Sequence, residues 1–298
     1  MQTLSSTDEG DYSRIIPTAK LVAYYRSFSD IPYAMETSKA LQAEEAWRQI
    51  LGDDLDLVTR LFAPSMEARY KCFDRFTSLY NNVLELAVGT SIERGIRISD
   101  DPEKIYVGTD LPEMITELRA LFNDLGLKKE RSNHHLEQAN ALSYEQLSAA
   151  SDHFCSRREV LVINEGLLIF LTREEQAICA ENVRKILERY GGKWVTTDVY
   201  FESNAQTPNS YEPGIDAALS RASQRHTNVT GRNLERSLFP SQETAIKFFQ
   251  EEGFDVNQYP MVSDLESISS ITRLWQEPER RLCEPKLRQE MVWIMSLR

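Results

Sequence analysis

One stretch, residues 83–112, constrains the fold of this chain more than any other. An apolar run at 83–88 has the length of a β-strand, and a turn of small residues at 89–91 leads from it into a short helical segment. A second strand is predicted at 104–108 and runs on to Asp110. A strand, a tight turn, a helix and a second strand ending in a carboxylate form half of a nucleotide-type pocket. The stretch therefore predicts a parallel α/β unit with a ligand at the strand ends.

The composition of the turn limits the class of ligand that it can bind. Gly89 is the only glycine at the usual loop positions, because Ala87 and Ser91 stand where a dinucleotide loop favours glycine. A ligand with a ribose and no pyrophosphate fits this turn better, and S-adenosylmethionine is the common one. The alternative is an ordinary βαβ unit, since Asp110 with the following residues 111–113 also makes a good helix start. On this stretch alone both interpretations stay open.

Composition limits the partners that we expect. The 298 residues carry a net charge of −12, which argues against nucleic acid or an anionic membrane as the main partner. No apolar run is long enough to span a bilayer, and the N-terminus lacks the basic and apolar regions of a signal peptide. The four cysteines form no CxxC pair, so we expect free thiols in a reducing cytoplasm and no metal site.

The order of predicted elements indicates the fold class. Residues 1–80 read as helices, and we expect them to form a cover that does not fold independently. Strands and helices then alternate through 81–298, which predicts a Rossmann-like sheet of seven mostly parallel strands with helices on both faces. A polar stretch at 202–240 interrupts the series as a lid inserted after strand five. An apolar run at 291–297 closes the chain as the last strand.

A seventh strand at the C-terminus is the order found in class I methyltransferases. Six spaced motifs add to this likeness: ARYKCFD (68–74), LELAVGTS (84–91), YVGTDLPEM (106–114), EQANAL (137–142), INEGLLIFLT (163–172) and VWIMSL (292–297). Together they resemble the leucine carboxyl methyltransferases, and more closely their bacterial relatives, the tetracenomycin-type polyketide O-methyltransferases. The segment at 18–34 fits that branch as well, whereas the single glycine of the 87–91 turn departs from the family loop.

The resemblance implies S-adenosylmethionine as cofactor and gives roles to particular residues. Arg69 would pair with the carboxylate of the cofactor, which suits the two-point contact of a guanidinium. The alternative is that Arg69 belongs to a solvated helix face. Gly89 would allow close backbone approach, and Glu85 would either hold this loop or receive the ammonium group of the cofactor. Asp110 would accept both ribose hydroxyls.

Three further residues fall where the family binds its cofactor. Asn140, or the backbone amide of Ala141, would recognise the adenine, although an ordinary loop asparagine is the alternative. Glu165 ends strand four, near the point where the methyl group should lie. It would hold the methionine ammonium or orient the acceptor, and a helix-start residue is the alternative.

The acceptor side is less defined by the sequence. Among the four histidines only His226, within the predicted lid, is placed to act as a base, and a surface histidine is the alternative. Tyr25 is a candidate for the acceptor pocket, although aromatic residues at helical spacing also form ordinary cores.

The function predicted from all of these features is O-methylation of a hydroxyl or carboxyl group on a small, polyketide-like or aromatic acceptor. Methylation of a protein C-terminus, an NAD-binding dehydrogenase and a non-catalytic S-adenosylmethionine-binding protein are the alternatives. The sequence does not indicate the oligomeric state.

Overall fold

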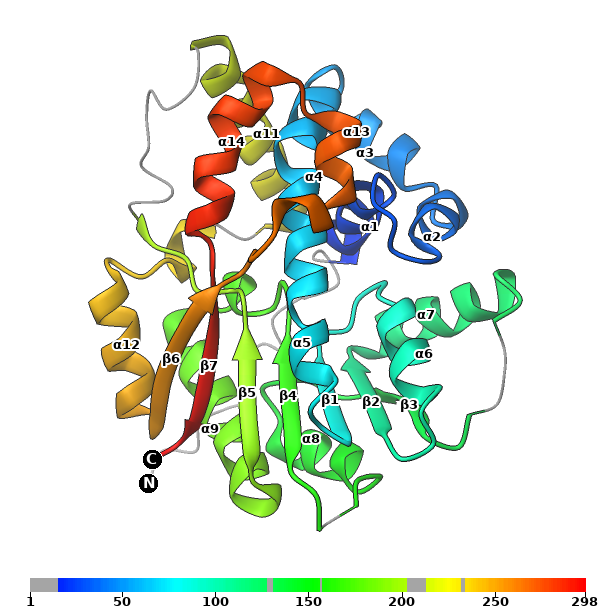
Figure 1. Ribbon diagram of the computed structural model, residues 1–298, viewed down its shortest axis with the longest axis vertical. Coiled ribbons are helices and arrows are strands. Elements are labelled where there is room, and N and C mark those ends of the chain that lie inside the picture. The colour runs from blue at the N-terminus through cyan, green and yellow to red at the C-terminus, as the bar shows by residue number, and fades with distance from the viewer. Residues whose placement is uncertain (1–15, 128–130, 156, 203–212, 232–233) are drawn as a thin grey trace, which may run out of the picture.

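The computed structural model describes residues 16–127, 131–155, 157–202, 213–231 and 234–298. Its centre is a seven-stranded sheet in the order β3-β2-β1-β4-β5-β7-β6 (Figure 1). All neighbouring strands are parallel except β7, which runs antiparallel to β5 and β6. This sheet confirms the predicted fold class. The strands are β1 (Asn82–Leu86), β2 (Ile105–Asp110), β3 (His134–Gln138), β4 (Val160–Asn164), β5 (Gly192–Thr196), β6 (Phe254–Pro260) and β7 (Met291–Leu297).

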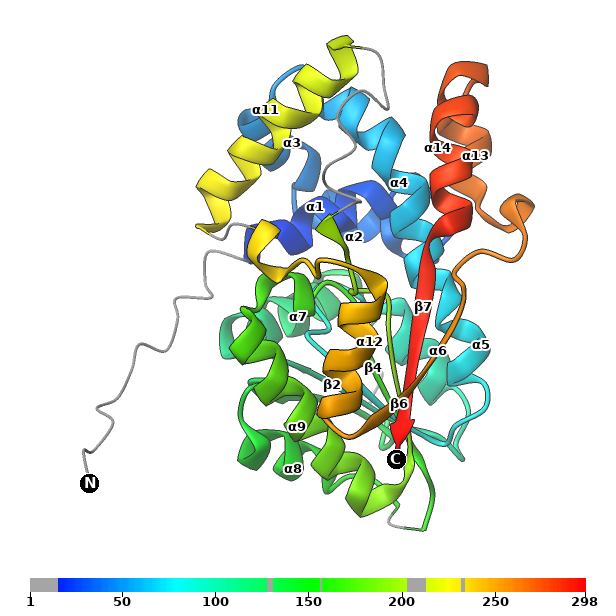
Figure 2. The ribbon, with the colours of Figure 1, turned by 90° about the vertical axis from the view of Figure 1, so that its left-hand side faces the viewer.

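Alternation along the buried strands supplies a hydrophobic core on each face of the sheet. In β1, Leu84 and Leu86 pack into one core, and Val83 packs into the other. Figure 2 shows α8, α9 and α12 on one side and α5 and α6 on the other. The helices beside the sheet are α5 (Asp74–Thr77), α6 (Glu93–Ser99), α7 (Pro112–Asp124), α8 (Tyr144–Ser151), α9 (Arg173–Tyr190) and α12 (Gln242–Glu251).

The remaining helices form a cover beyond the carboxyl ends of the parallel strands (Figures 1 and 2). Its main helices are α1 (Ile16–Arg26), α2 (Ala34–Ala40), α3 (Ala43–Leu51), α4 (Asp54–Cys72), α11 (Pro213–Thr230), α13 (Ser269–Leu274) and α14 (Glu277–Gln289), with short 3-10 turns η2 (Leu168–Phe170), η3 (Leu234–Ser237) and η4 (Leu265–Ser267). One apolar cluster joins Leu21, Trp47 and Leu55 of the N-terminal helices to Ala222 of α11. The N-terminal cover and the insertion after β5 therefore pack as one layer.

The described part of the predicted lid at 202–240 is mainly one helix. This helix is α11, which packs on α3 and α4, and residues 203–212 and 232–233 lie outside the described residues. Residues 1–15 of the predicted cover lie outside them too. Among the described helices, none combines the length and the apolar character needed to cross a membrane.

Pro64 lies inside α4 and not at the start of a helix, where proline is favoured. A proline there lacks the N–H that would bond to the carbonyl of Arg60, four residues earlier. In this fold the indole N–H of Trp275 donates to that carbonyl at 2.8 Å. The long-range bond satisfies the group that the proline leaves free, which is how the helix continues through Pro64.

Candidate functional site

A cavity of about 530 Å³ lies between the carboxyl ends of the strands and the helical cover. Its walls come from the segments that follow β1, β2, β3 and β4, and from α1, α3, α4 and α11. All of the predicted site residues except Glu85 line it: Tyr25, Arg69, Gly89, Asp110, Asn140, Ala141, Glu165 and His226. The fold thus brings together residues from sequence positions 25 to 226 at the edge of the sheet where open α/β folds bind ligands.

The turn after β1 is held by Asp110. The backbone at Ala87 and Gly89 is left-handed, with φ of 52° and 56°. Glycine adopts this conformation freely, whereas the Cβ of Ala87 makes it costly. The N–H of Gly89 donates to Asp110 Oδ2 at 2.8 Å, so the carboxylate at the end of β2 fixes the neighbouring turn.

Asp110 does not act as the N-cap of the helix that follows it. The residue that caps α7 is Leu111, and no side-chain bond caps that helix. Asp110 Oδ1 accepts a bond from the N–H of Leu111 at 2.8 Å. Burial raises the pKa of the Asp110 carboxyl to about 6, while the bonds from Gly89 and Leu111 favour its ionised form. A half-buried carboxylate that faces a cavity, with only one bond to each oxygen, retains capacity to accept two more.

Asn140 and Ala141 lie at the same end of the cavity, in the segment after β3. The side-chain oxygen of Asn140 accepts from the N–H of Leu142 at 2.9 Å, which makes a local Asx turn. The backbone N–H of Asn140 donates to Gln146 Oε1 at 2.8 Å. These bonds fix the segment, and they leave the side-chain amide of Asn140 as the group available for a ligand.

Charged side chains of both signs meet at the centre of the cavity wall. Glu165 lies 2.6 Å from Arg26 Nη2 and 3.8 Å from Arg69 Nε. Burial acts to raise the pKa of Glu165, but Arg26, Arg69 and Arg94 outweigh it and lower that pKa. The wall therefore presents buried guanidinium groups beside an ionised carboxylate.

Asp198 holds both Arg69 and the backbone that follows Glu165. Its carboxylate lies 3.2 Å from Arg69 Nη2 and accepts from the N–H groups of Gly166 and Leu167 at 2.8 and 2.7 Å. Sequence reasoning missed both Asp198 and Arg26. Asp198 follows β5 as Asp110 ends β2, so the strand-end rule could have found it. Arg26 closes an apolar and aromatic helix and gave no comparable local signal.

The assignment of Glu85 to the cofactor needs correction. Its side chain is buried away from the cavity lining, on the face of β1 that meets α6. One carboxylate oxygen binds Arg94 Nη1, and the other accepts from the Tyr106 hydroxyl at 2.7 Å. Because both oxygens have partners inside the core, the geometry fits the alternative in which Glu85 holds the loop from within.

The other end of the cavity is apolar and comes from the cover. The side chains of Leu21, Leu51, Val58, Phe62, Met66 and Leu219 line it together with aromatic groups. His226 stacks on Trp47 and on Phe170, with ring centroids 6.0 and 6.4 Å apart. Its Nδ1 is buried and has no hydrogen-bond partner among the described residues. Burial lowers the pKa of His226, so the imidazole is neutral at neutral pH.

Tyr25 lines the same end and is 5% exposed. Burial raises the pKa of its hydroxyl above the ordinary value. The hydroxyl thus keeps its proton at neutral pH, and it can donate or accept a hydrogen bond but cannot act as a phenolate base. This excludes Tyr25 as the group that removes a proton.

The fold agrees with that of solved structures of low sequence identity. A DUF574 family protein from Streptomyces avermitilis is 13% identical, with 94% of this chain and 97% of that chain covered and a TM-score of 0.57. A putative methyltransferase from Thermobifida fusca is 12% identical, with 93% and 94% covered and a TM-score of 0.53. No family model and no curated protein matches the chain. At these identities the likeness establishes a shared fold over nearly the whole length of each protein.

Proposed function

We propose that this protein is an S-adenosylmethionine-dependent O-methyltransferase acting on a hydroxyl group of a small, largely apolar acceptor. The observation that carries the proposal is the division of one cavity into two chemically different ends. Strand ends supply a polar end with Asp110, and Glu165, after β4, meets Arg69 of α4 in a charged centre. The cover supplies an apolar end with a single imidazole, that of His226.

The residues present fit this cofactor. Asp110 has acceptor capacity left for two ribose hydroxyls, and Asn140 offers its amide at the adenine side. Arg69 and Glu165 carry the opposite charges that an amino-acid group with both a carboxylate and an ammonium requires. Nε of Arg69 is buried without a hydrogen-bond partner among the described residues, which is consistent with a group that is completed by a ligand.

A dinucleotide fits this cavity less well. Its pyrophosphate would need the backbone of the 87–91 turn to be open to the ligand. A Cβ placed on Gly89 would be in ordinary contact with Ala19 Cβ, at 3.7 Å, and Thr90 Oγ1 donates to the carbonyl of Ala19 at 3.3 Å. Helix α1 thus packs directly on this turn, which disfavours an NAD-binding dehydrogenase.

When bound, S-adenosylmethionine supplies a methyl group that is already activated by its sulfonium. The task of the chain is therefore to orient the acceptor oxygen and to exclude water. The cover does both, because its apolar side chains close the acceptor end. His226 would accept the proton of the acceptor hydroxyl at an imidazole nitrogen, and Tyr25 would position that hydroxyl through a hydrogen bond.

The lining favours a hydroxyl over a carboxyl acceptor. A carboxylate in an apolar chamber needs a cationic partner. Of the two guanidinium groups that line the cavity, Arg26 pairs with Glu165, and Arg69 pairs with Asp198 and is assigned to the cofactor carboxylate. This supports a polyketide-like or aromatic hydroxyl compound, as in the tetracenomycin-type branch, over methylation of a protein C-terminus.

Calorimetry with S-adenosylmethionine, S-adenosylhomocysteine and NAD tests the proposal. We expect the two sulfur ligands to bind and NAD to bind weakly or not at all. Asp110→Ala should lower S-adenosylhomocysteine affinity by about 2–4 kcal/mol, because two charge-assisted bonds are lost and the 87–91 turn is released. Asp124→Ala, at the exposed end of α7, is the matched control and should bind normally. Tight NAD binding without a response to the sulfur ligands would end this proposal.

Binding without turnover is the remaining alternative, a non-catalytic S-adenosylmethionine-binding protein. It is separated from an enzyme by incubating the protein with labelled S-adenosylmethionine and a panel of aromatic hydroxyl compounds. The proposal requires transfer of label to at least one of them, and His226→Gln should reduce that transfer.

A further inference from the structure

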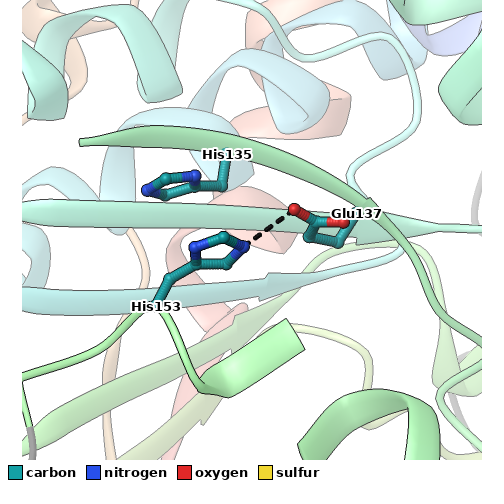
Figure 3. A group of neighbouring side chains, drawn as sticks. All are labelled: His135, Glu137 and His153. Atoms are coloured by element: carbon teal, nitrogen blue, oxygen red, sulfur yellow. Dashed lines mark hydrogen bonds and ion pairs between the residues drawn. The ribbon is translucent and has the colours of Figure 1, made fainter. Parts of the chain in front are cut away.

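Three side chains of the types that bind metal ions meet outside the cavity, on the edge strand of the sheet. His135 and Glu137 lie on β3, and His153 lies in the turn after α8 (Figure 3). The Nε2 atom of His153 is 2.8 Å from Glu137 Oε1. The rings of His135 and His153 stack with centroids 3.7 Å apart and planes 13° from parallel. One potential ligand atom from each residue lies within 4.8 Å of the other two.

The fold creates this group from residues that no sequence motif links. His135 and Glu137 are two apart on a strand, so both side chains point to the face that α8 covers. His134 points to the opposite face, where its ring packs on Tyr106 and Phe122. The turn after α8 then brings His153 against the strand. Spacing along the sequence predicted no metal site because the third ligand is contributed by another element.

The turn that carries His153 is anchored through the two residues before it. Asp152 accepts a bond from Arg189 of α9 at 2.8 Å. The carbonyl of Ser151 accepts one from the hydroxyl of Tyr190 at 2.8 Å. The histidine is thus presented from a fixed backbone, while its side chain is 35% exposed and that of Glu137 is 37% exposed. A cation can reach the group from solvent without any opening of the core.

From this geometry we propose that His135, Glu137 and His153 bind one divalent cation of the zinc class. Two imidazoles and one carboxylate are a common zinc donor set, with water filling a fourth position. In a tetrahedral zinc site the ligand atoms lie about 3.4 Å apart, so the Glu137–His153 pair must open from 2.8 Å and the two stacked rings must turn until a nitrogen of each faces the cation. The exposed side chain of His153 can turn in this way without movement of the strand.

A structural role follows from the position of the three residues. None of them lines the cavity, so the cation would not touch the reacting groups. It would instead tie the edge strand β3 to the turn after α8. The inference does not depend on the proposed function, because a cation would bind here whatever the cavity holds.

The test uses the full chain, stripped of metal with a chelator and titrated with Zn²⁺ by calorimetry. We expect saturable binding of one Zn²⁺ per chain. Replacing a ligand should cost at least as much as replacing an outer-shell partner, so His153→Ala and Glu137→Gln should each lower zinc affinity by at least about tenfold. Co²⁺ in place of Zn²⁺ should give visible absorption bands of a low-coordinate site, and both variants should lose them.

Two control variants define the ligand set. Glu145→Gln removes an exposed acid from α8, and Cys155→Ser removes the exposed thiol two residues after His153. Both should retain wild-type zinc affinity. The proposal is overturned if Zn²⁺ does not bind saturably, if His153→Ala and Glu137→Gln bind it like the wild type, or if Cys155→Ser abolishes binding. Far-ultraviolet circular dichroism of each variant checks the fold, and the two ligand variants give independent answers if one of them fails to fold.

Discussion

Removing the buried guanidinium of Arg94 should reveal what Glu85 does. Arg94 is 0% exposed and binds Glu85, the carbonyl of Tyr70 at 3.0 Å and Glu165 at 3.5 Å. In Arg94→Met, Glu165 keeps Arg26 at 2.6 Å, whereas Glu85 keeps only the hydroxyl of Tyr106. An uncompensated buried carboxylate costs about 3–5 kcal/mol of unfolding free energy. The substitution also removes the cation–π contact of Arg94 with the Tyr70 ring, whose centroid lies 4.1 Å away. The decrease in unfolding free energy should therefore fall in the upper half of that range.

Urea denaturation of single and double variants measures this loss. Adding Glu85→Gln to Arg94→Met removes the orphaned charge and keeps an acceptor for Tyr106, so it should recover at least about 2 kcal/mol. Arg97→Met is the control on the same helix, because the Arg97 side chain is 40% exposed and its pair with the exposed Asp74 is worth less than about 1 kcal/mol. The double variant should keep S-adenosylhomocysteine affinity within about tenfold. A stable Arg94→Met, or a double variant that folds but no longer binds the ligand, would refute the structural role of Glu85.

Three shorter predictions address the cavity. Ala87→Gly should raise the free energy of unfolding by about 0.5–1 kcal/mol in urea denaturation, because it relieves a left-handed alanine. His226→Gln should lower turnover of a hydroxyl acceptor by about 10²–10⁴-fold and leave S-adenosylhomocysteine affinity unchanged in calorimetry. Asp110 should make that affinity fall as pH drops through about 6, where its carboxylate becomes protonated. The free energy of unfolding should change in the opposite direction with pH. Because the pKa of Asp110 in the folded protein lies above the ordinary 3.8, the stabilising contribution of this group is lost as pH rises through about 6.

The parts of the fold that follow from the sequence are those with a strong local signal. Residues 160–163 form an uninterrupted apolar run and 291–295 a second one, and both lie in largely buried strands. Asp110 could be placed because a strand-end carboxylate after a glycine turn is a local pattern. By contrast α14 was not predicted, because its buried side is narrow, with Cys283 and Leu287, in an otherwise charged segment.

Long-range polar contacts are the part that the sequence could not supply. From its place in a strand next to the glycine turn, Glu85 could either hold the loop or bind the ligand. Its side chain follows the alternation of β1 and points toward α6. There it accepts a hydrogen bond from Arg94, which lies nine residues later in the chain. His226 was weighed against an ordinary surface histidine, and only the packing of α11 on α3 brings its ring against Trp47.

The charged centre of the cavity explains why the N-terminal helices and the sheet have to act together. Its guanidinium groups come from the cover, Arg26 from α1 and Arg69 from α4, while the carboxylates come from segments after β4 and β5. Without the sheet, Arg26 and Arg69 would lose their carboxylate partners, and without the cover Glu165 would keep only the longer contact with Arg94, at 3.5 Å. Both losses leave buried charges less well paired, which is costly. Docking of the cover neutralises them and at the same time builds the part of the wall that faces Glu165. The proposed cofactor end is therefore formed at the contact between the two layers and belongs to neither of them alone.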